Sequence, residues 1–266
     1  MKLLKHVFIT LKTESPILFW ITMLHFFGAL ACIPAIVIDD RTLLGVNVWI
    51  KPLKFLISGG IYVATVGYLI TFYPYSKKKK DILRNINSWA LLLEIAIIVY
   101  QGARGVQSHY NQASLFDGLL FAAMGILISI NVLLMVLFLI DAIRLKLKVD
   151  SPIRLAIVLG WIVIIVGSWV GGQMIAQLAH TVGVADGGPG LPLVNWSTIA
   201  GDLRIAHFFG LHGIQIIPLF AFWVAKKWNT TVMNKNIAVV VFVLCYISWI
   251  GFTFYQAKQG IALLQL

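Results

Sequence analysis

Seven apolar segments dominate the chain, and each is long enough to cross a lipid bilayer. They cover approximately residues 15–38, 55–75, 87–107, 115–140, 153–180, 204–225 and 236–257. A spanning helix needs about 20 mostly apolar residues to cross a hydrocarbon layer about 30 Å thick. Backbone groups in lipid must be satisfied within the protein, and helices achieve this. The pattern therefore predicts an all-α, seven-helix integral membrane bundle that forms a single polytopic domain over residues 1–266.

Composition agrees with this pattern. Apolar residues make up 60% of the chain, charged residues make up 12%, and the mean hydropathy is +0.90. Soluble domains carry about one-quarter charged residues, so we expect the lipid bilayer to be the main environment of this protein. The chain shows no convincing internal repeat. Its two cysteines, Cys32 and Cys245, lie in apolar segments and form no metal-binding motif.

Basic residues lie mostly on one side of the predicted bundle. One set of loops and helix ends holds fifteen Lys and Arg residues, and the opposite set holds six. The positive-inside rule places the richer set in the cytoplasm, which predicts a cytoplasmic N-terminus and an external C-terminus. The net charge of +11 comes largely from short juxtamembrane runs such as SKKKKDILR, which fix topology and can meet anionic lipid. We therefore expect no nucleic-acid partner.

The stretch GDLRIAHFFGLHGIQ, at residues 201–215, brings polar side chains into the start of the sixth apolar segment. Polar side chains in hydrocarbon are costly and often mark a functional site. Asp202 stands at the position of a helix N-cap. A five-residue separation turns His207 about 140° away from His212 around a helix, so each histidine needs partners from another helix. The remaining polar side chains of the stretch are Arg204 and Gln215.

Two further segments carry polar side chains at helical spacing. In the third, Glu94 and Gln101 are seven residues apart and share a face, because seven residues are about two turns of helix. Arg104 follows near the outer end. In the fifth, polar side chains recur at i, i+4 and i+7. We expect an outward-facing cavity among the third, fifth and sixth helices that binds a small-molecule ligand, with these ligand-binding residues: Glu94, Gln101, Arg104, Gln173, Gln177, Arg204 and Gln215.

Three histidines at the outer end are candidate metal ligands: His180, His207 and His212. Two histidines from different helices can hold a b-type haem, with arginines offsetting the propionate charge, and imidazole also suits several transition metals. The chain contains no distinctive haem motif. The alternative interpretation is structural: the histidines form hydrogen bonds between helices, and Glu94 forms an ion pair with Arg104 or Arg204.

Functions of three classes fit these residues. The first is ligand binding, with haem or a metal serving electron transfer as a special case. The second is proton-coupled transport of a small solute, against which the absence of an evident repeat counts. The third is a non-catalytic membrane sensor or an assembly protein, and no protein partner can be named. Ser197 lies in NWSTIAG, which is not a nucleophile elbow, so hydrolase chemistry is disfavoured and the question of enzymatic activity stays open.

Two phrases of the sequence, NVWIKPLKF at residues 47–55 and GDLRIAHFFGLHGIQ, are similar to strings in an uncharacterised family of small bacterial polytopic inner-membrane proteins. The similarity covers about a tenth of the chain. It implies a multi-pass protein of the bacterial inner (plasma) membrane. It implies no activity that can be carried over to individual residues.

The charge distribution generates a prediction about topology. A reporter that is active only in the cytoplasm should be silent when it is fused after Leu266, and it should be active when it is inserted within residues 77–84. The reason is that the loops rich in Lys and Arg stay in the cytoplasm. Activity after Leu266 together with silence at 77–84 would reverse the orientation and move the predicted site to the cytoplasmic side.

Overall fold

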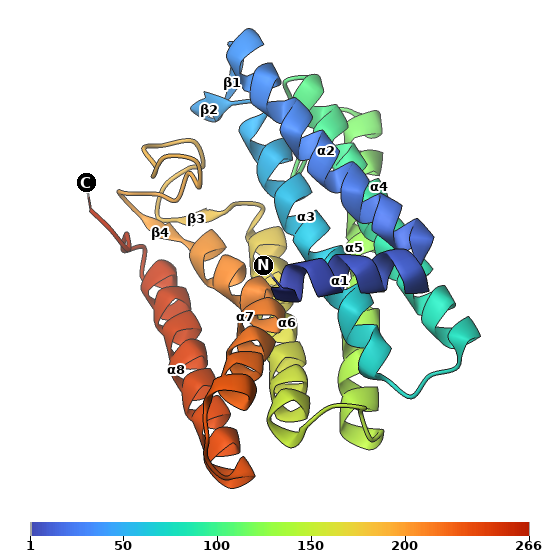
Figure 1. Ribbon diagram of the computed structural model, residues 1–266. Coiled ribbons are helices and arrows are strands. Elements are labelled where there is room, and N and C mark those ends of the chain that lie inside the picture. The colour runs from blue at the N-terminus through green and yellow to red at the C-terminus, as the bar shows by residue number, and fades with distance from the viewer. Residues whose placement is uncertain (1, 266) are drawn as a thin grey trace. The chain divides into compact units, whose positions relative to one another are not determined.

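The computed structural model describes residues 2–265 and contains seven helices that are long and apolar enough to cross a membrane. The prediction of a seven-span, all-α membrane protein is thus confirmed, whereas its orientation stays a prediction. The spans are α2 (Pro16–Ile38), α3 (Ile50–Leu69, continued by the 3-10 turn η1, Ile70–Phe72), α4 (Lys77–Ala103), α5 (Leu115–Arg144), α6 (Ser151–Gln177), α7 (Leu203–Lys227) and α8 (Val232–Lys258) (Figure 1).

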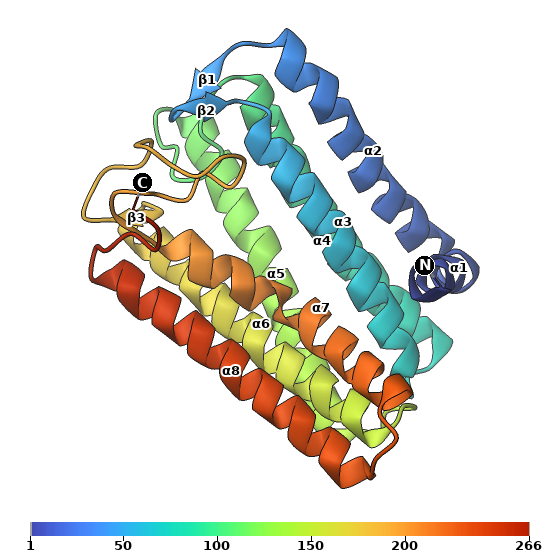
Figure 2. The ribbon, with the colours of Figure 1, turned by 60° about the vertical axis from the view of Figure 1, so that its left-hand side comes forward.

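A further helix, α1 (Lys2–Glu14), precedes the spans, and two short strand pairs join them. The helix α1 runs at a steep angle to α2 (Figures 1 and 2). It is amphipathic, with Leu11 buried and Lys5 and Lys12 exposed, as in a helix that lies in a membrane interface. The strands are β1 (Thr42–Leu43) with β2 (Val46–Asn47), and β3 (Thr181–Val182) with β4 (Gly201–Asp202).

The start of α4 differs from the sequence prediction. The helix begins at Lys77, ten residues before the predicted boundary at 87, because Ser76 caps it by accepting a hydrogen bond from the Lys79 amide (3.3 Å). Lysine and arginine are also good helix formers. SKKKKDILR is therefore helical rather than a loop. A cytoplasmic reporter is better placed at residues 145–150, between α5 and α6, where an insertion interrupts no helix.

The chain divides into two compact units within α5. Unit 1 comprises the described residues up to Leu134, and unit 2 runs from Met135 to residue 265. In unit 1, α3 packs against both α2 and α4; in unit 2, α7 packs against both α6 and α8 (Figure 2). Each unit has its own apolar core. Leu18, Val63 and Ile98 are buried in unit 1, and Trp161, Ile214 and Val239 are buried in unit 2.

The closest packing in unit 2 lies between α6 and α7, where glycines face one another. A Cβ atom added to Gly167 would lie 2.5 Å from the carbonyl carbon of Gly210. A Cβ atom added to Gly213 would lie 2.3 Å from Val163. Small residues allow membrane helices to approach this closely, and the contact replaces the hydrophobic force that is missing in lipid. These glycines therefore allow the close packing of α6 against α7.

The two units repeat the same connection between their first two spans. In the strand pair of unit 1, Thr42 is opposite Asn47, and in that of unit 2, Thr181 is opposite Asp202. Asn47 accepts a hydrogen bond from the amide two residues later (2.9 Å), and Asp202 does the same (3.0 Å). In both units, the residue after the strand pair donates a backbone hydrogen bond to the residue before it. The Val48 amide donates to the carbonyl oxygen of Arg41 (3.1 Å), and the Leu203 amide donates to the carbonyl oxygen of His180 (3.0 Å).

The last span of each unit is repeated as well. Both α4 and α8 are 27 residues long, and Thr231 caps α8 just as Ser76 caps α4. Two residues after the end of each helix stands a glycine with positive φ, 72° at Gly105 and 73° at Gly260, in the sequences YQGARG and YQAKQG. The paired positions differ by 155 in each case (231 − 76, 260 − 105 and 202 − 47). The chain thus contains an internal repeat of three spans, and the expectation of none is wrong.

The number of candidate spans predicts a parallel rather than an inverted repeat. The first span of unit 1 is α2, and the first span of unit 2 is α6, in sequences that begin ESPI and DSPI. Three spans, α3, α4 and α5, lie between α2 and α6, so α2 and α6 cross the membrane in the same direction if every candidate span crosses. The helix α5 makes this possible, because it adds one crossing between two groups of three.

The contact between α6 and α7 generates a prediction. Gly167→Ala should lower the stability of the folded protein by about 1–3 kcal/mol, because its methyl group would overlap the backbone of Gly210. Gly172→Ala on the same helix is the matched control, since nothing lies within 4 Å of its added Cβ. Thermal unfolding in detergent measures both variants. Equal midpoints for the two variants would contradict the packing described for Gly167.

Candidate functional site

A line of buried polar side chains runs along α4 in unit 1. Asn87, Glu94 and Gln101 are each seven residues apart, so they share a face of the helix, and all three are buried. The helix α5 meets this face. Asn87 Nδ2 donates to Asn131 Oδ1 (2.7 Å), and Gln101 Nε2 donates to Asp117 Oδ1 (2.9 Å). Because the helices are antiparallel, these two pairs place Glu94 midway between them, at the level of Met124 on α5.

Glu94 is the member of this line without a partner. Its side chain is 6% exposed, and its Oε2 atom is buried without a hydrogen bond. Within unit 1, Glu94 has no ion pair with Arg104, and both arginines named as possible partners bind other carboxylates. Arg104 binds Asp117 (2.6 Å), and Arg204 binds Asp202 (2.6 Å). Within the described residues, this buried carboxyl group of a candidate span has no ion pair.

His25 on α2 lies at the same depth in unit 1 as Glu94. A Cβ atom added to Gly59 on α3 would meet both the His25 ring (3.1 Å) and the side chain of Ile95 (2.3 Å), the residue after Glu94. His25 Nδ1 donates to the carbonyl oxygen of Ile21 (2.8 Å), and its Nε2 atom is buried without a partner. Sequence analysis did not include His25 in the site, although Gly59-Gly60 on a neighbouring span was a signal that a bulky side chain packs there.

Gln101 and Arg104 have a structural role at the end of α4. Arg104 NH1 donates to Gln101 Oε1 (2.6 Å) as well as to Asp117. Ser114 Oγ also donates to Asp117 (2.8 Å). The Arg104 guanidinium lies over the rings of Tyr100 and Phe116, at 5.6 and 5.3 Å from their centres. This network holds the end of α4 against the start of α5, so both predicted residues are engaged within the protein.

The connection before α3 is fixed by an aspartate that contacts both Arg41 and Trp49. Asp39 binds the Arg41 guanidinium (2.7 Å) and accepts a hydrogen bond from Trp49 Nε1 (2.9 Å). Hydrogen bonds from Arg41 and Trp49 hold the pKa of Asp39 well below its usual range. Trp49 is thereby fixed at the start of α3.

Asp202 and Arg204 organise the corresponding end of unit 2. Asp202 caps α7, as expected, by accepting a hydrogen bond from the Arg204 amide (3.0 Å), and it also accepts one from the Ser197 amide (2.8 Å). The Arg204 guanidinium binds Asp202 and donates to the carbonyl oxygen of Asn195. Arg204 therefore closes the long loop between β3 and β4 onto α7.

The predicted metal ligands each have another contact in unit 2. His207 Nδ1 donates to the carbonyl oxygen of Gly167 (2.8 Å), and the His212 ring lies 4.4 Å from the Phe208 ring. His180 Nδ1 is 2.5 Å from Asp186 Oδ2. Within residues 2–265, no group of three His, Cys, Asp or Glu side chains is arranged to hold a metal ion. The assignment of these histidines to a metal stays a prediction.

The predicted glutamines of unit 2 are bound locally or lack a defined contact. Gln177 Nε2 donates to the carbonyl oxygens of Ala179 (3.0 Å) and Thr181 (3.2 Å), just beyond the end of α6. The Gln215 amide lies beside the carbonyls of Leu211 and His212 in its own helix. Gln173 is half-buried on α6. The predicted cavity draws residues from both units, and as a whole it stays a prediction.

Asp186 holds the first turn of the long loop of unit 2. It accepts hydrogen bonds from the backbone amides of His180 and Thr181 (both 3.0 Å) and from Thr181 Oγ1 (2.7 Å). Burial alone would raise the pKa of Asp186, but the contacts with His180 and Thr181 outweigh burial and hold the pKa well below its usual range. The ionised carboxylate is therefore the form that this loop requires.

Comparisons of the chain with protein-family models, with curated proteins and with solved structures found no match. The function must accordingly be argued from the residues and their contacts.

The contacts of Asp186 generate a prediction about pH. A group whose pKa falls on folding stabilises the folded loop above its unfolded pKa, about 3.9 for aspartate, and the contribution disappears as the pH falls. Protection of the amides of residues 180–186 against hydrogen exchange, measured relative to the intrinsic rate at each pH, should therefore be high at pH 6–7 and should fall at acidic pH. Asp186→Ala should give fast exchange at every pH. Asp40→Ala, which removes an exposed carboxylate, is the control. Slow exchange in Asp186→Ala would show that the carboxylate does not hold the loop.

Proposed function

We propose that this protein is a proton-coupled transporter of a small solute in the bacterial inner membrane, and that Glu94 carries the proton. In this proposal, the seven spans work as one polytopic domain. The observation that carries the proposal is the buried carboxyl group of Glu94, which has, among the residues that the structure describes, no hydrogen bond to Oε2 and no ion pair.

The free-energy cost of placing a carboxyl group inside a membrane makes Glu94 informative about function. Ionisable groups inside a membrane are expensive, so those that persist without a partner commonly mark proton relays or ion pathways. A proton or a bound cation removes the charge that hydrocarbon disfavours. Asn87 and Gln101 extend the polar face of α4 to either side of Glu94. Amide side chains both donate and accept hydrogen bonds, and they remain uncharged, so they can line a polar path on either side of Glu94.

His25 supports the same proposal. It shares the depth of Glu94 in unit 1, and its Nε2 atom is buried and unpartnered. Histidine and glutamate occur together in the proton relays of pumps and transporters. We assign His25 the role of a second proton-binding group on the path that leads to Glu94.

The internal repeat also supports transport. Many secondary transporters are built from internal repeats, and parallel repeats related by an axis along the membrane normal are one of the known arrangements. Sequence analysis counted the absence of a repeat against a transporter. The repeat of α2–α4 in α6–α8 removes that objection. A sensor or an assembly protein would not require two copies of a three-span unit.

Haem and metal binding are not part of the proposal. A free Nε2 atom beside a bonded Nδ1 atom, as at His25, is the arrangement found in metal-ligating histidines, but it suits proton exchange equally well. The small-molecule ligand predicted from the sequence is then the transported solute. His212 and Gln215 on α7 and Gln173 on α6 remain candidates for contacts with that solute.

Transport can be tested in liposomes that contain the purified protein and a trapped pH-sensitive dye. Amino acids, sugars and small carboxylic acids are added one at a time to the outside. We expect one class of solute to drive a change in the internal pH, because the solute and the proton cross together. Glu94→Gln should abolish that change, because the amide cannot release a proton.

Glu14→Gln is the matched control. Glu14 is the other glutamate of the chain; it lies outside the spans and is bound to Arg84 (3.0 Å). The amide oxygen that replaces its carboxylate can still accept a hydrogen bond from Arg84, so transport should be retained. Solute-driven proton flux of full size in Glu94→Gln would refute the proposal, as would solute uptake that never changes the internal pH.

A further inference from the structure

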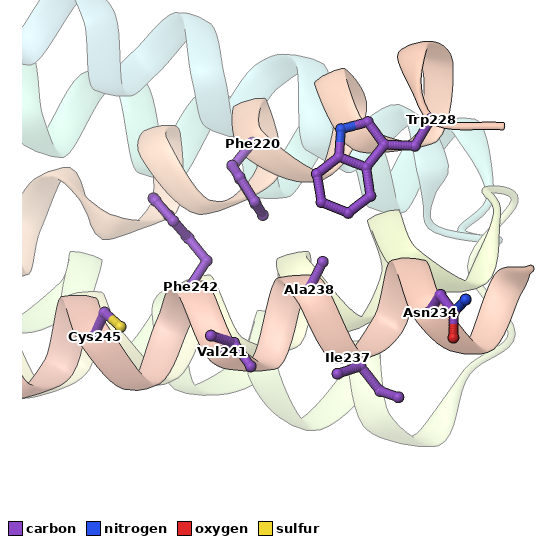
Figure 3. Close-up of a pocket in the computed structure, with 8 residues that line it drawn as sticks. All are labelled: Phe220, Trp228, Asn234, Ile237, Ala238, Val241, Phe242 and Cys245. Carbon is purple, nitrogen blue, oxygen red and sulfur yellow. The ribbon is translucent and has the colours of Figure 1, made fainter. Parts of the chain in front are cut away.

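An apolar groove lies between α7 and α8 in unit 2, near the connection that joins them. Its volume is about 530 Å³, within the range of about 300–1,000 Å³ seen for small-molecule sites. Figure 3 shows Phe220 and Trp228 on one side facing Phe242 and Ala238 on the other. The rings of Phe220 and Phe242 stack on one another, with their centroids 4.1 Å apart.

The groove is long enough for one acyl chain. It extends along α8 from Asn234 to Cys245, which is 11 residues (245 − 234), or about 16 Å of helix. The hydrocarbon layer is about 30 Å thick, so this length matches the depth of one leaflet. Asn234 and Trp228 lie at the end nearest the connection, and tryptophan is typical of the level of lipid head groups.

Basic residues surround that end of the groove. Lys226 and Lys227 are exposed at the end of α7, directly before Trp228, and Lys235 follows Asn234. Lys235 Nζ donates to the carbonyl oxygen of Ala225 (3.1 Å), whereas neither Lys226 nor Lys227 has an ion pair within the described residues. Residues 203–266 contain no Asp or Glu. The hairpin therefore carries positive charge that its own residues do not neutralise.

We infer that this groove binds an anionic glycerophospholipid, with one acyl chain against Phe220, Ala238 and Phe242 and the phosphate at Lys226 and Lys227. Apolar length and cationic charge meet at one end of one hairpin, and an anionic phospholipid is the membrane component that satisfies both. A neutral lipid fills the groove without using the lysines. A soluble anion uses the lysines without filling the groove. The inference is independent of the proposed transport activity.

Cys245 provides a test in the protein with its full chain. It is exposed in the groove, whereas Cys32 is buried, so Cys32→Ser leaves a single reporter thiol. Phosphatidylglycerol added to the detergent-purified protein should slow the reaction of Cys245 with a maleimide. Phosphatidylcholine at the same concentration, or glycerol phosphate without acyl chains, should not. Equal protection by phosphatidylcholine would eliminate the role of charge, and protection by glycerol phosphate would eliminate the role of the groove.

Variants separate the two parts of the site. Lys226→Gln with Lys227→Gln should weaken phosphatidylglycerol binding about 30-fold in native mass spectrometry, because each lysine near a membrane surface contributes about fivefold. Lys77→Gln with Lys78→Gln removes the same charge from another helix end and should change binding less than twofold, or about 0.4 kcal/mol. Ala238→Trp should block the groove, whereas Val240→Trp adds the same bulk to α8 outside the lining. Undiminished binding in Lys226→Gln/Lys227→Gln or in Ala238→Trp would overturn the inference.

Discussion

Polar groups that enter a lipid bilayer must find their partners inside the protein, and the structure of each unit follows from this constraint. The ends of the spans show it most clearly. Ser76 and Thr231 cap the last span of each unit, and Asp202 caps α7. Asp117 gathers Gln101, Arg104 and Ser114, so that every charged or amide group of that cluster is bound. Five buried side-chain atoms of the described residues lack a hydrogen-bond partner, and Glu94 Oε2 is the one among them that belongs to a carboxyl group, so an account of function must explain it.

The internal repeat shows where the two units share a structural solution and where they differ. The positions that correspond to Asn87, Glu94 and Gln101 in α8 are Phe242, Trp249 and Gln256. Only the glutamine is kept, and it is buried in both helices. The polar line with its carboxyl group therefore belongs to unit 1 alone, whereas the corresponding face of α8 contributes Phe242 to the apolar groove. One scaffold thus carries a polar face in one copy and an apolar face in the other.

Hydrophobic patterning predicted all seven spans, because 20 consecutive apolar residues have few alternatives to crossing a membrane. It placed the start of α4 too late, because lysines look like a loop on a hydropathy scale although they continue a helix well. The repeat was overlooked because lipid-facing residues need only be apolar, which leaves identity at a few capping and turn positions such as Gly105 and Gly260. ESPI with DSPI, and YQGARG with YQAKQG, were the signals that could have revealed it.

The candidate site was predicted in part. Periodicity correctly placed Glu94 and Gln101 on one face of α4, because seven residues return to nearly the same direction on any helix. The partners of Arg104 and Arg204 could not be predicted, since each binds an aspartate whose position depends on the packing of a helix end or the course of a loop. His25 was missed for the same kind of reason. Its place beside Gly59 depends on how α2 packs against α3, and the spacing of residues within one span does not contain that information.

The chemical state of Glu94 is the central claim, and carbodiimide labelling tests it most directly. A hydrophobic carbodiimide reacts with a protonated carboxyl group in an apolar setting, and the chain contains only two glutamates, Glu14 and Glu94. The account predicts one adduct per chain, located on Glu94 by peptide mass spectrometry and absent from Glu94→Gln. A protein that stays unlabelled at Glu94 in a folded, monodisperse preparation would contradict a proton-carrying role for this residue.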